Sequence, residues 1–409
     1  MIYKADYVIT MAGPPIKDGA VKIRGNRISE VRSISQMTID NDEEVKVFKD
    51  TIIMPGLINA HCHLELGYAR GLFPPGEAFS MWLARVEKSR KEQLDEDYEN
   101  AIRLGIMESI HSGTTTLFDV GKTGLNIKIF PDETVRSFPV REFSGGETNL
   151  NYQQFDEQIA YISEGSSSFL FPDKCQPSVS IRSPYTCSET FFRHVLTRQN
   201  NLRVPFSFHL SEGQEEEGLY KTNSGQLHDF CERNFGTPPD FQGKNPVNYL
   251  LERKLIPQKT LLVHCNVLDV KSASRLAEKN VSIAHCPRSS DFFEHPEFPF
   301  ELCYNNNINV CLGTESMACN EDLSLFEEMH MFRSKYPHVD CSEVLKLATV
   351  NGARALGMED SLGKLLPGYL ADFIGITIKH DPAFDMFDEI VCEEHEVAMA
   401  MIDGEEVLI

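Results

Sequence analysis

The sequence predicts a fold of the α/β class, a (β/α)8 TIM barrel with a small β-sandwich domain built from both chain ends. Through the middle of the chain, eight short apolar or β-branched runs alternate with longer segments of helical periodicity, which is typical of such a barrel. The two ends instead contain short strand-like runs separated by Gly and Asn turns. We therefore expect residues 1–54 and 366–409 to form the small domain and residues 55–365 to form the barrel.

Eight runs supply the expected barrel strands. Segments that suit helices, such as residues 99–112 and 271–279, precede or follow most of them. In chain order the runs are TIIMPGLINA, GTTTLFDV, VREFSGGE, VSIRSPYT, VPFSFHLSE, TLLVHCNV, NVSIAHCP and NINVCLGTES. Because (β/α)8 barrels build their active sites at the carboxyl ends of the strands, polar residues that end these runs are the first candidates for function.

The composition is that of a globular protein with an acidic balance. The 409 residues are 41% hydrophobic and 24% charged, with a formal net charge of -22. This charge repels phosphate backbones and anionic lipid surfaces, so we expect a small-molecule substrate and neither nucleic acid nor membrane as a partner. No apolar run approaches the length of about 18 residues that a membrane span needs. Eleven cysteines without a C-x-x-C pair indicate reduced thiols and a cytoplasmic protein.

Histidines and an acid end several of the runs. His61 and His63 follow the first run with one residue between them, and alternate strand residues face the same side, so both imidazoles should point into the barrel mouth. His209, His264 and Glu315 end the fifth, sixth and eighth runs. Imidazole nitrogens with one carboxylate suit zinc or ferrous iron and leave a position for water. An H-x-H pair alone is more typical of surface or capping histidines, so this prediction depends on the other strand ends.

Several longer motifs occur together and in a definite order. They are MPGLINAHCHLEL, SPYTCS, HLSE, LLVHCNVL, AHCPRSS, CLGTES, DLSLFEEM, LATVNGARALG and GKLLPGYLADFIGI. Together they resemble the amidohydrolase superfamily, and within it the cytosine deaminase-like branch, which includes the S-adenosylhomocysteine and methylthioadenosine deaminases, the aminodeoxyfutalosine deaminases and the triazine hydrolases. The resemblance covers essentially the whole chain and is much less specific for a substrate than for the superfamily.

The resemblance implies a role for each polar strand end. The implied ligands of one divalent metal, zinc first and iron as the alternative, are His61, His63, His209 and Glu315. It implies Glu212 as the proton shuttle, and His264 as the group that orients the attacking water or polarises the reacting centre. The fourth run lacks the terminal lysine that bridges two metals in dinuclear relatives, which favours a single metal. The alternatives are an acid at a helix N-terminus for Glu212 and a backbone-bonded histidine for His264.

Four positions depart from the family pattern. Glu315 stands where aspartate is usual, and its extra methylene moves the carboxylate by about one carbon–carbon bond, whereas a metal–oxygen distance must stay near 2.0–2.2 Å. Arg182 replaces a histidine that contacts substrate in relatives, and a guanidinium can clamp a carboxylate or phosphate with two hydrogen bonds. Cys319 replaces a frequent serine, and Ser290 replaces an asparagine. These changes weaken any transfer of nucleoside specificity.

Three further features are expected to border the mouth. Trp82 lies in a segment that relatives place over the site, with core packing as the equal alternative. His285, in AHCP, is either a pocket residue or a structural one. Residues 212–230 could close over a substrate, although their acid run more often marks a solvated helix face. Relatives are commonly homodimers or larger, so we expect a homo-oligomer.

Two classes of function remain open. The first is a metal-dependent aminohydrolase that deaminates an adenine nucleoside or a related heterocycle. The second is an amidohydrolase fold that has lost turnover and serves in binding or regulation; a hydrolase of a non-nucleoside substrate with an acidic group is a further possibility. The sequence has no G-x-S-x-G elbow, Walker loop or H-E-x-x-H motif, and it lacks the H-x-E and P-C-x-x-C signature of the other zinc deaminase fold.

Overall fold

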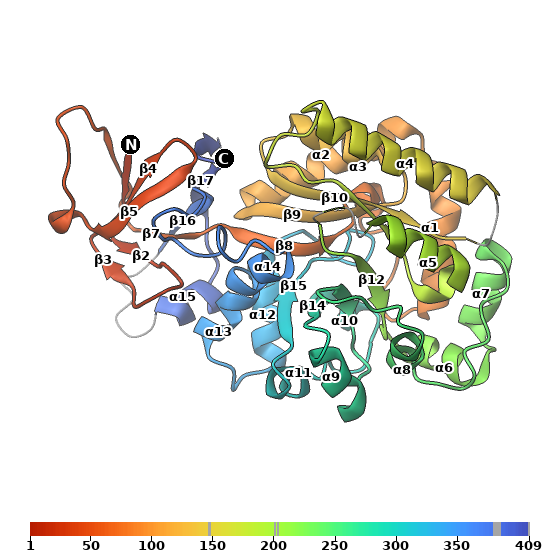
Figure 1. Ribbon diagram of the computed structural model, residues 1–409. Coiled ribbons are helices and arrows are strands. Elements are labelled where there is room, and N and C mark those ends of the chain that lie inside the picture. The colour runs from red at the N-terminus through yellow and green to blue at the C-terminus, as the bar shows by residue number, and fades with distance from the viewer. Residues whose placement is uncertain (146–148, 200–201, 203, 379–385, 408–409) are drawn as a thin grey trace.

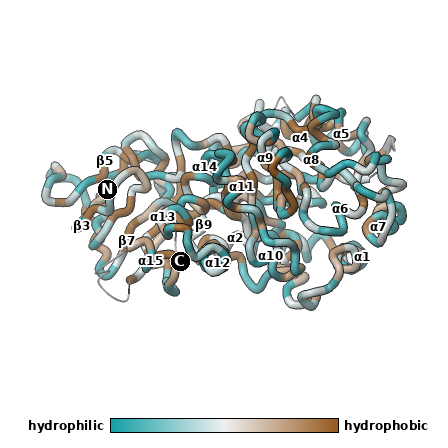
Figure 2. The backbone as a smooth tube through the Cα atoms, turned by 90° about the horizontal axis from the view of Figure 1, so that it is seen from below, coloured by the Kyte–Doolittle hydropathy of each residue, from teal (hydrophilic) through white to brown (hydrophobic). Residues whose placement is uncertain are grey.

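The computed structural model describes residues 1–145, 149–199, 202, 204–378 and 386–407. Figure 1 shows a larger part built of parallel strands with helices around them and a smaller part built of antiparallel strands. Both chain termini lie at the smaller end, and Figure 2 shows the same elongated arrangement from below. Among the described residues, no helix combines the length and apolarity that crossing a bilayer requires.

The strands form four sheets, two parallel and two mainly antiparallel. The parallel sheets have the orders β11-β10-β9-β8 and β12-β13-β14-β15, and the other two have the orders β5-β4-β1-β6 and β18-β17-β16-β7-β2-β3. The strands are β1 Ile2–Lys4, β2 Tyr7–Val8, β3 Ile16–Lys17, β4 Gly19–Arg24, β5 Arg27–Ser33, β6 Val45–Val47, β7 Thr51–Pro55, β8 Leu57–Cys62, β9 Thr114–Gly121, β10 Arg136–Phe143, β11 Ser178–Ile181, β12 Ser207–Leu210, β13 Leu261–His264, β14 Ser282–His285, β15 Asn309–Leu312, β16 Phe373–Thr377, β17 Val397–Ile402 and β18 Glu405–Val407.

The helices lie mainly between the parallel strands in sequence and outside them in space (Figure 1). The α-helices are α1 Phe79–Arg90, α2 Asp95–His111, α3 Leu125–Ile129, α4 Asn149–Ser167, α5 Glu189–Gln199, α6 Gln214–Thr222, α7 Gln226–Phe235, α8 Pro246–Glu252, α9 Val270–Ala277, α10 Pro287–Phe292, α11 Phe300–Asn305, α12 Leu325–Lys335, α13 Cys341–Leu347, α14 Val350–Ala355 and α15 Met386–Cys392. Short 3-10 helices are η1 Ile34–Gln36, η2 Leu64–Ala69, η3 Phe130–Asp132 and η4 Pro184–Thr186.

Each of the eight expected runs contains residues of a parallel strand, β8 to β15, so this part of the prediction is confirmed. The first run proves to contain two strands: β7 pairs with β16 in the six-stranded sheet, and β8 pairs with β9. The helical segments 99–112 and 271–279 fall on α2 and α9. The α/β class is thus correct, and the strand order in each parallel sheet follows the order along the chain.

The two parallel sheets approach each other at both of their edges. Cys62, the last residue of β8, forms a parallel bridge with Glu315 beyond β15. At the other edge the backbone amide of His209 in β12 donates to the carbonyl of Arg182, one residue after β11, at 2.9 Å. One buried apolar cluster contains Phe118 from the first sheet and Leu261 from the second. The two sheets therefore share an interior.

The strands are buried on both faces, as parallel strands covered by helices should be. In β9, Phe118 belongs to the interior cluster, whereas the adjacent Leu117 belongs to the larger cluster that also contains helix residues such as Ile102 and Ile106 of α2. Alternate residues of one strand thus pack inward and outward.

The two antiparallel sheets draw their strands from both ends of the chain. Phe373 of β16 and Tyr3 of β1 belong to different sheets but to one apolar cluster, with ring centroids 5.5 Å apart. A buried ion-pair network joins these sheets to the parallel part: Arg136, the first residue of β10, donates to both carboxylate oxygens of Asp372 at 2.6 and 3.0 Å and to Asp403 at 2.8 Å. The network lies at the amino end of β10, away from the histidines.

Candidate metal centre

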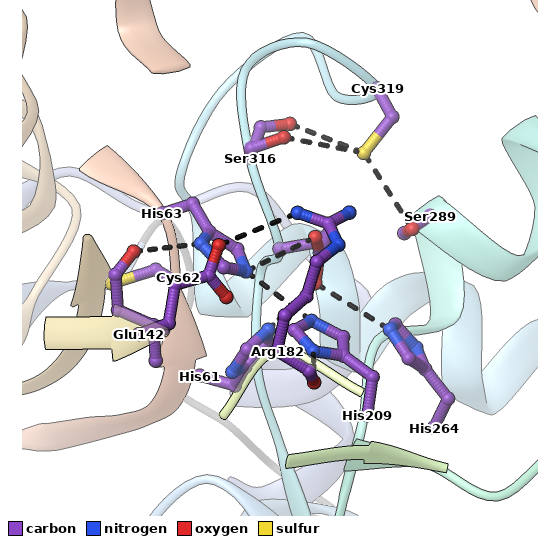
Figure 3. A network of polar contacts seen from close by, with 12 residues as sticks. His61, Cys62, His63, Glu142, Arg182, His209, His264, Ser289, Ser316 and Cys319 are labelled. Carbon is purple, nitrogen blue, oxygen red and sulfur yellow. Dashed lines mark hydrogen bonds and ion pairs between the residues drawn. The ribbon is translucent and has the colours of Figure 1, made fainter. Parts of the chain in front are cut away.

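Three histidines and one glutamate from distant parts of the sequence meet at the carboxyl ends of the parallel strands. The possible ligand atoms of His61, His63, His209 and Glu315 all lie within 4.8 Å of one another, and all four side chains are buried. Glu315 Oε2 lies 2.8 Å from His61 Nε2, and Glu315 Oε1 lies 3.5 Å from His63 Nε2. Figure 3 shows the imidazoles gathered in one group. The carboxylate therefore reaches the histidines in spite of its extra methylene.

Local backbone features place these side chains. The pairing of β8 with β9 shifts register between Asn59 and Cys62, and such bulges re-aim side chains next to sites. A Cβ on Gly313 would lie 2.7 Å from the backbone oxygen of His61, so only glycine lets the segment after β15 come this close. Glu315 itself has φ 56°, a left-handed conformation that is unfavourable for a residue with a side chain. This turn directs its carboxylate back to the histidines.

Hydrogen bonds fix two of the imidazoles so that the same ring atom faces inward. His63 Nδ1 donates to the backbone oxygen of Val120 at 2.7 Å, and His209 Nδ1 donates to that of Arg182 at 2.8 Å. A carbonyl can only accept, so in the neutral rings each Nε2 carries a lone pair and no proton. The two Nε2 atoms lie 3.3 Å apart. Two lone pairs at this separation repel each other unless a cation lies between them.

The site otherwise lacks the partners that buried polar atoms need. Among the described residues, Nδ1 of His61 and both ring nitrogens of His264 have no hydrogen-bond partner, and the 2.8 Å contact between His61 Nε2 and Glu315 Oε2 lacks the geometry of a hydrogen bond. Nitrogens held tetrahedrally at about 2.05 Å from zinc are about 3.3 Å apart, which is the separation of the Nε2 atoms of His63 and His209. Buried imidazole and carboxylate donors are also the ligand types that zinc and iron take. The residues present thus fit a divalent metal.

Charge and burial oppose each other at Glu315. Burial alone would raise the pKa of its carboxyl, but the adjacent His63 and His61 outweigh burial and hold the pKa well below its usual range. The pKa of His63 is also held well below its usual range, chiefly by burial. Glu315 is therefore ionised and His63 neutral, which are the protonation states in which these groups bind metals.

A second buried group adjoins the cluster on the side of β12 and β13. Glu212 Oε1 lies 3.4 Å from His264 Nε2 and 3.7 Å from His295 Nε2. His264 also lies 3.7 Å from Glu315 Oε2 and adopts φ 70°, another left-handed conformation. Burial would raise the pKa of Glu212, but the His264 and His295 rings outweigh it and lower the pKa to about 2. Glu212 is therefore a buried carboxylate within reach of the cluster.

The acid run after β12 does not form the solvated helix face that its composition favoured. Glu216 and Glu217 are buried in α6, at 2% and 8% exposure. Glu216 accepts a hydrogen bond from the backbone amide of Glu212 at 2.9 Å, which holds the turn that carries the Glu212 side chain. Burial, together with the nearby Glu212 carboxylate, raises the pKa of Glu216 to about 8 against the effect of its backbone bonds. The expected solvated face was thus wrong, because these acids support the strand end.

Arg182 already has an acidic partner within the protein. Its Nη1 lies 3.4 Å from Oε1 of Glu142, which is buried in β10. Burial opposes the charge on Arg182, but Glu142 outweighs burial and raises the pKa of the guanidinium. Figure 3 shows the Arg182 side chain beside the histidine group. A substrate carboxylate would therefore have to share the guanidinium with Glu142.

Trp82, His285 and Cys319 make their main contacts around the cluster rather than within it. Trp82 is 2% exposed, and its Nε1 donates to the backbone oxygen of Ala318 at 3.2 Å, so it packs in the core and holds the segment before Cys319. The ring of His285 stacks on Phe298, with centroids 4.2 Å apart. The Cys319 thiol lies 3.6 Å from Ser289 Oγ (Figure 3). These residues form the surroundings of the site.

Sequence reasoning missed His295, Glu142 and the buried role of Glu216. His295 lies in the segment after α10, outside every strand end and motif, and only its position against Gly213 and Glu212 makes it notable. Its side chain is 7% exposed, and Nε2 is buried without a hydrogen-bond partner among the described residues. A histidine followed by proline in a polar segment carries no periodic signal, so the sequence offered no way to find it.

Comparisons with known proteins agree with this architecture. The chain is 28% identical over 394 residues to a 5-methylthioadenosine/S-adenosylhomocysteine deaminase of Pyrococcus furiosus, covering 93% of this chain and 85% of that protein. The structure of Helicobacter pylori aminofutalosine deaminase in complex with methylthio-coformycin matches with a TM-score of 0.87 at 20% identity, covering 100% of both chains. An adenosine deaminase of Xanthomonas campestris with bound zinc matches with a TM-score of 0.85 at 21% identity, covering 100% of this chain and 92% of that one.

A family profile matches most of the chain. Residues 52–407, which include the whole histidine cluster and most of the described structure, match the profile of the Amidohydrolase family. This agrees with the resemblance read from the motifs and with the similar deaminases. The chain therefore belongs to the amidohydrolase family.

Proposed function

We propose that this protein is a metal-dependent hydrolase of carbon–nitrogen bonds that removes an amino group from an adenine nucleoside or a related heterocycle. One observation carries the proposal: the Nε2 lone pairs of His63 and His209 face each other at 3.3 Å beside the carboxylate of Glu315, an arrangement that a bound cation would stabilise. The named activities of similar proteins, which act on methylthioadenosine, S-adenosylhomocysteine or aminofutalosine, support the substrate class.

The metal would be held by His61, His63, His209 and Glu315. Zinc is the first choice, because the donor set of three imidazoles and one carboxylate suits it and one similar structure contains it; iron is the alternative. A metal bound here supplies activated water at neutral pH. A single ion is proposed, since β11 is followed by Arg182 and not by a lysine that could bridge two ions.

Protein groups would then move the protons. Glu212 is ionised and lies beside the cluster, so its carboxylate can accept one proton from the attacking water and deliver it to a ring nitrogen, and can then pass the proton of the added hydroxyl to the leaving amine. His264 lies between Glu212 and Glu315, at 3.4 and 3.7 Å, and can orient the water or polarise the reacting carbon. His295 approaches the same oxygen of Glu212 and would hold that carboxylate in position.

The surrounding residues would bind and enclose the substrate. The partly exposed Arg182 and the buried Glu142 form a pair that offers both donors and acceptors to polar groups of a substrate. His285 and Cys319 border the site, and Trp82 supports the wall next to Cys319. Buried surroundings of this kind exclude bulk water and strengthen the interactions of charged groups with the reacting centre.

A second candidate function rests on Arg182. A buried guanidinium at this position favours a substrate with an acidic group, which need not be a nucleoside. The pairing with Glu142 argues against it, because a second carboxylate would bring two negative charges to one guanidinium. A catalytically impaired binding or regulatory protein is favoured by the four departures from the family pattern, including Glu315 for aspartate. The geometry argues against impairment, since Glu315 reaches the histidines.

For the architecture, we propose that the two parallel sheets form one closed (β/α)8 barrel over residues 55–365. The bridge from Cys62 to Glu315 and the bond from His209 to Arg182 support closure at both edges. We further propose that residues 1–54 and 366–409 form a β-sandwich, because the two antiparallel sheets share one apolar cluster. A cytoplasmic location and a homo-oligomeric assembly stay predictions from the sequence.

The experiment combines metal analysis with a substrate screen. The protein is purified with zinc, its metal content is measured, and ammonia release is followed with adenosine, 5′-deoxyadenosine, methylthioadenosine, S-adenosylhomocysteine and aminofutalosine. We expect one metal bound by the histidine cluster, lost in His63→Asn, and ammonia release from at least one compound, strongly reduced in Glu212→Gln. Metal-loaded protein that releases ammonia from none of them would refute the proposed deaminase, and near-zero metal content would support the binding or regulatory alternative.

A further inference from the structure

A second group of metal-binding side chains lies away from the histidine cluster, where helices α13 and α15 pack together. Cys341 is the first residue of α13, and Asp388 and Cys392 belong to α15. The possible ligand atoms of these three residues all lie within 4.8 Å of one another. Cys341 is buried, whereas the other two are exposed and open to entry from solvent. We propose that this trio binds a second divalent cation of the zinc and cadmium class through two thiolates, one carboxylate and one water.

The separation of the two sulfur atoms is that of a metal site. The Sγ atoms of Cys341 and Cys392 lie 3.8 Å apart. Two thiolates bound tetrahedrally to zinc at about 2.3 Å are about 3.8 Å apart, so both sulfurs already occupy corners of a suitable tetrahedron. A carboxylate oxygen completing the same tetrahedron would lie about 3.6 Å from each sulfur, and the exposed Asp388 carboxylate already lies within 4.8 Å of both. A disulfide would instead require the sulfurs to approach to about 2.05 Å.

The surrounding charges balance such an ion. Two thiolates and the carboxylate of Asp388 carry three negative charges, and a divalent cation leaves one of them uncompensated. Arg333 of α12 donates from Nε to the sulfur of Cys341 at 3.4 Å and supplies the remaining positive charge. Hydrogen bonds to coordinating sulfurs are typical of the surroundings of thiolate sites. Cation binding would itself displace the thiol protons.

The ion would connect parts of the chain that are distant in sequence. Cys341 and Cys392 are 51 residues apart. Helix α13 packs against α14 and β15 in the parallel part, whereas α15 leads into β17 of the six-stranded sheet. A cation shared by these helices would fasten the C-terminal segment to the parallel part, and it would stabilise the folded chain in proportion to its concentration relative to its dissociation constant. The site is structural and is independent of the proposed deaminase.

Cadmium titration tests the site on the full-length, metal-loaded protein. Cd²⁺ is added under reducing conditions, and the ultraviolet charge-transfer band of a thiolate–cadmium bond is recorded together with the metal content per chain. We expect one further ion per chain, with the band lost in Cys341→Ser and in Cys392→Ser and the affinity lowered roughly tenfold or more in Asp388→Asn. Cys175→Ser, which removes a buried cysteine elsewhere, is the matched control and should leave the band unchanged. His63→Asn should remove the central metal and keep the band.

Two results would overturn the proposal. One is the absence of a saturable band in the wild-type protein, and the other is a band that survives both serine variants. If a serine variant fails to fold, alkylation of the exposed Cys392 in the folded wild-type protein replaces it, because capping this sulfur must abolish the band. A protein whose intact mass under reducing conditions is already lower by two hydrogen atoms, with a Cys341–Cys392 peptide link, would show that the pair forms a disulfide instead.

Discussion

The two ends of the parallel strands treat buried polar groups in opposite ways. At the carboxyl ends, Nδ1 of His61 and both ring nitrogens of His264 are buried without a hydrogen-bond partner among the described residues. At the amino end of β10, Arg136 uses its guanidinium to bind both oxygens of Asp372 and one of Asp403. The carboxyl ends therefore present unpaired polar atoms that a ligand could bind, whereas at the amino end the donors and acceptors pair with one another.

Within one set of strands, the polar groups at the carboxyl ends thus serve function and those at the amino end serve stability. A buried polar atom without a partner costs roughly 1–3 kcal/mol, and a left-handed non-glycine residue such as His264 or Glu315 adds about 1–3 kcal/mol. Such costs persist where a bound ligand offsets them. In the network of Arg136 the buried charges are paired with one another, and the network joins the parallel strands to the sheets made from the chain ends. Substitutions at the two ends should therefore fail in different assays.

The largest effect is expected from removing a donor at the carboxyl ends. His63→Asn takes away one of the facing Nε2 atoms, so the metal should be lost and the activity should fall by roughly 10⁴-fold or more, because water is no longer activated. The melting temperature of the metal-free variant should equal or exceed that of the metal-free wild type, since the repulsion between two lone pairs is gone. Metal analysis, initial rates and calorimetry measure these quantities. Full metal content in the variant would contradict the assignment.

The next largest effect is expected from a substitution that impairs proton transfer but leaves the metal bound. Glu212→Gln keeps the size of the side chain but removes its ability to accept a proton, so kcat should fall by about 10²–10⁴-fold with unchanged metal content. Glu278→Gln, at an exposed position, is the matched control and should leave kcat unchanged. A Glu212→Gln variant that loses its metal instead would show that Glu212 supports the ligands and does not move protons.

The sequence predicted most of this carboxyl end, because strand periodicity and polar strand ends are local signals. The spacing of His61 and His63 and the runs that end in His209 and Glu315 indicated a metal site, and the family resemblance implied the four ligands that lie in one cluster. The left-handed turn at Glu315 was not predictable, since the sequence alone showed only an acid one methylene longer than usual.

Pairings between separate elements were the part that the sequence could not supply. Glu142 and Arg182 lie on neighbouring strands, and nothing in either run indicates which residue faces the other. The acids of α6 were predicted to be solvated because composition gives the charge of a segment but not the direction of its side chains. Glu216 instead points inward and accepts a hydrogen bond from a backbone amide. The partners of Arg136 come from the far end of the chain, beyond any local pattern. These contacts depend on how the elements pack.

At the amino ends, a substitution should affect stability and leave the metal in place. Arg136→Ala leaves the buried carboxylate of Asp372 without its partner, and the free energy of unfolding should fall by about 3–5 kcal/mol. Arg193→Ala removes an exposed ion pair with Glu189 and should change the free energy of unfolding by less than about 1 kcal/mol. Denaturant unfolding measures both. Loss of metal affinity in Arg136→Ala, at a temperature where the variant is folded, would mean that the two ends are coupled.

The smallest effect sharpens the comparison within the carboxyl end itself. Among the described residues, His295 lies near Glu212 and forms no ion pair or hydrogen bond with the four clustered ligands, so it should act only through the position of that carboxylate. His295→Ala should lower kcat by roughly tenfold, with little change in KM or metal content, because the carboxylate loses one of its two neighbouring rings. His295→Gln, which places a polar donor of similar length beside Glu212, should recover most of the loss. Equal losses in both variants, accompanied by equal falls in melting temperature, would reduce His295 to a packing residue, since packing against Phe79 and Phe293 does not depend on a hydrogen-bond donor.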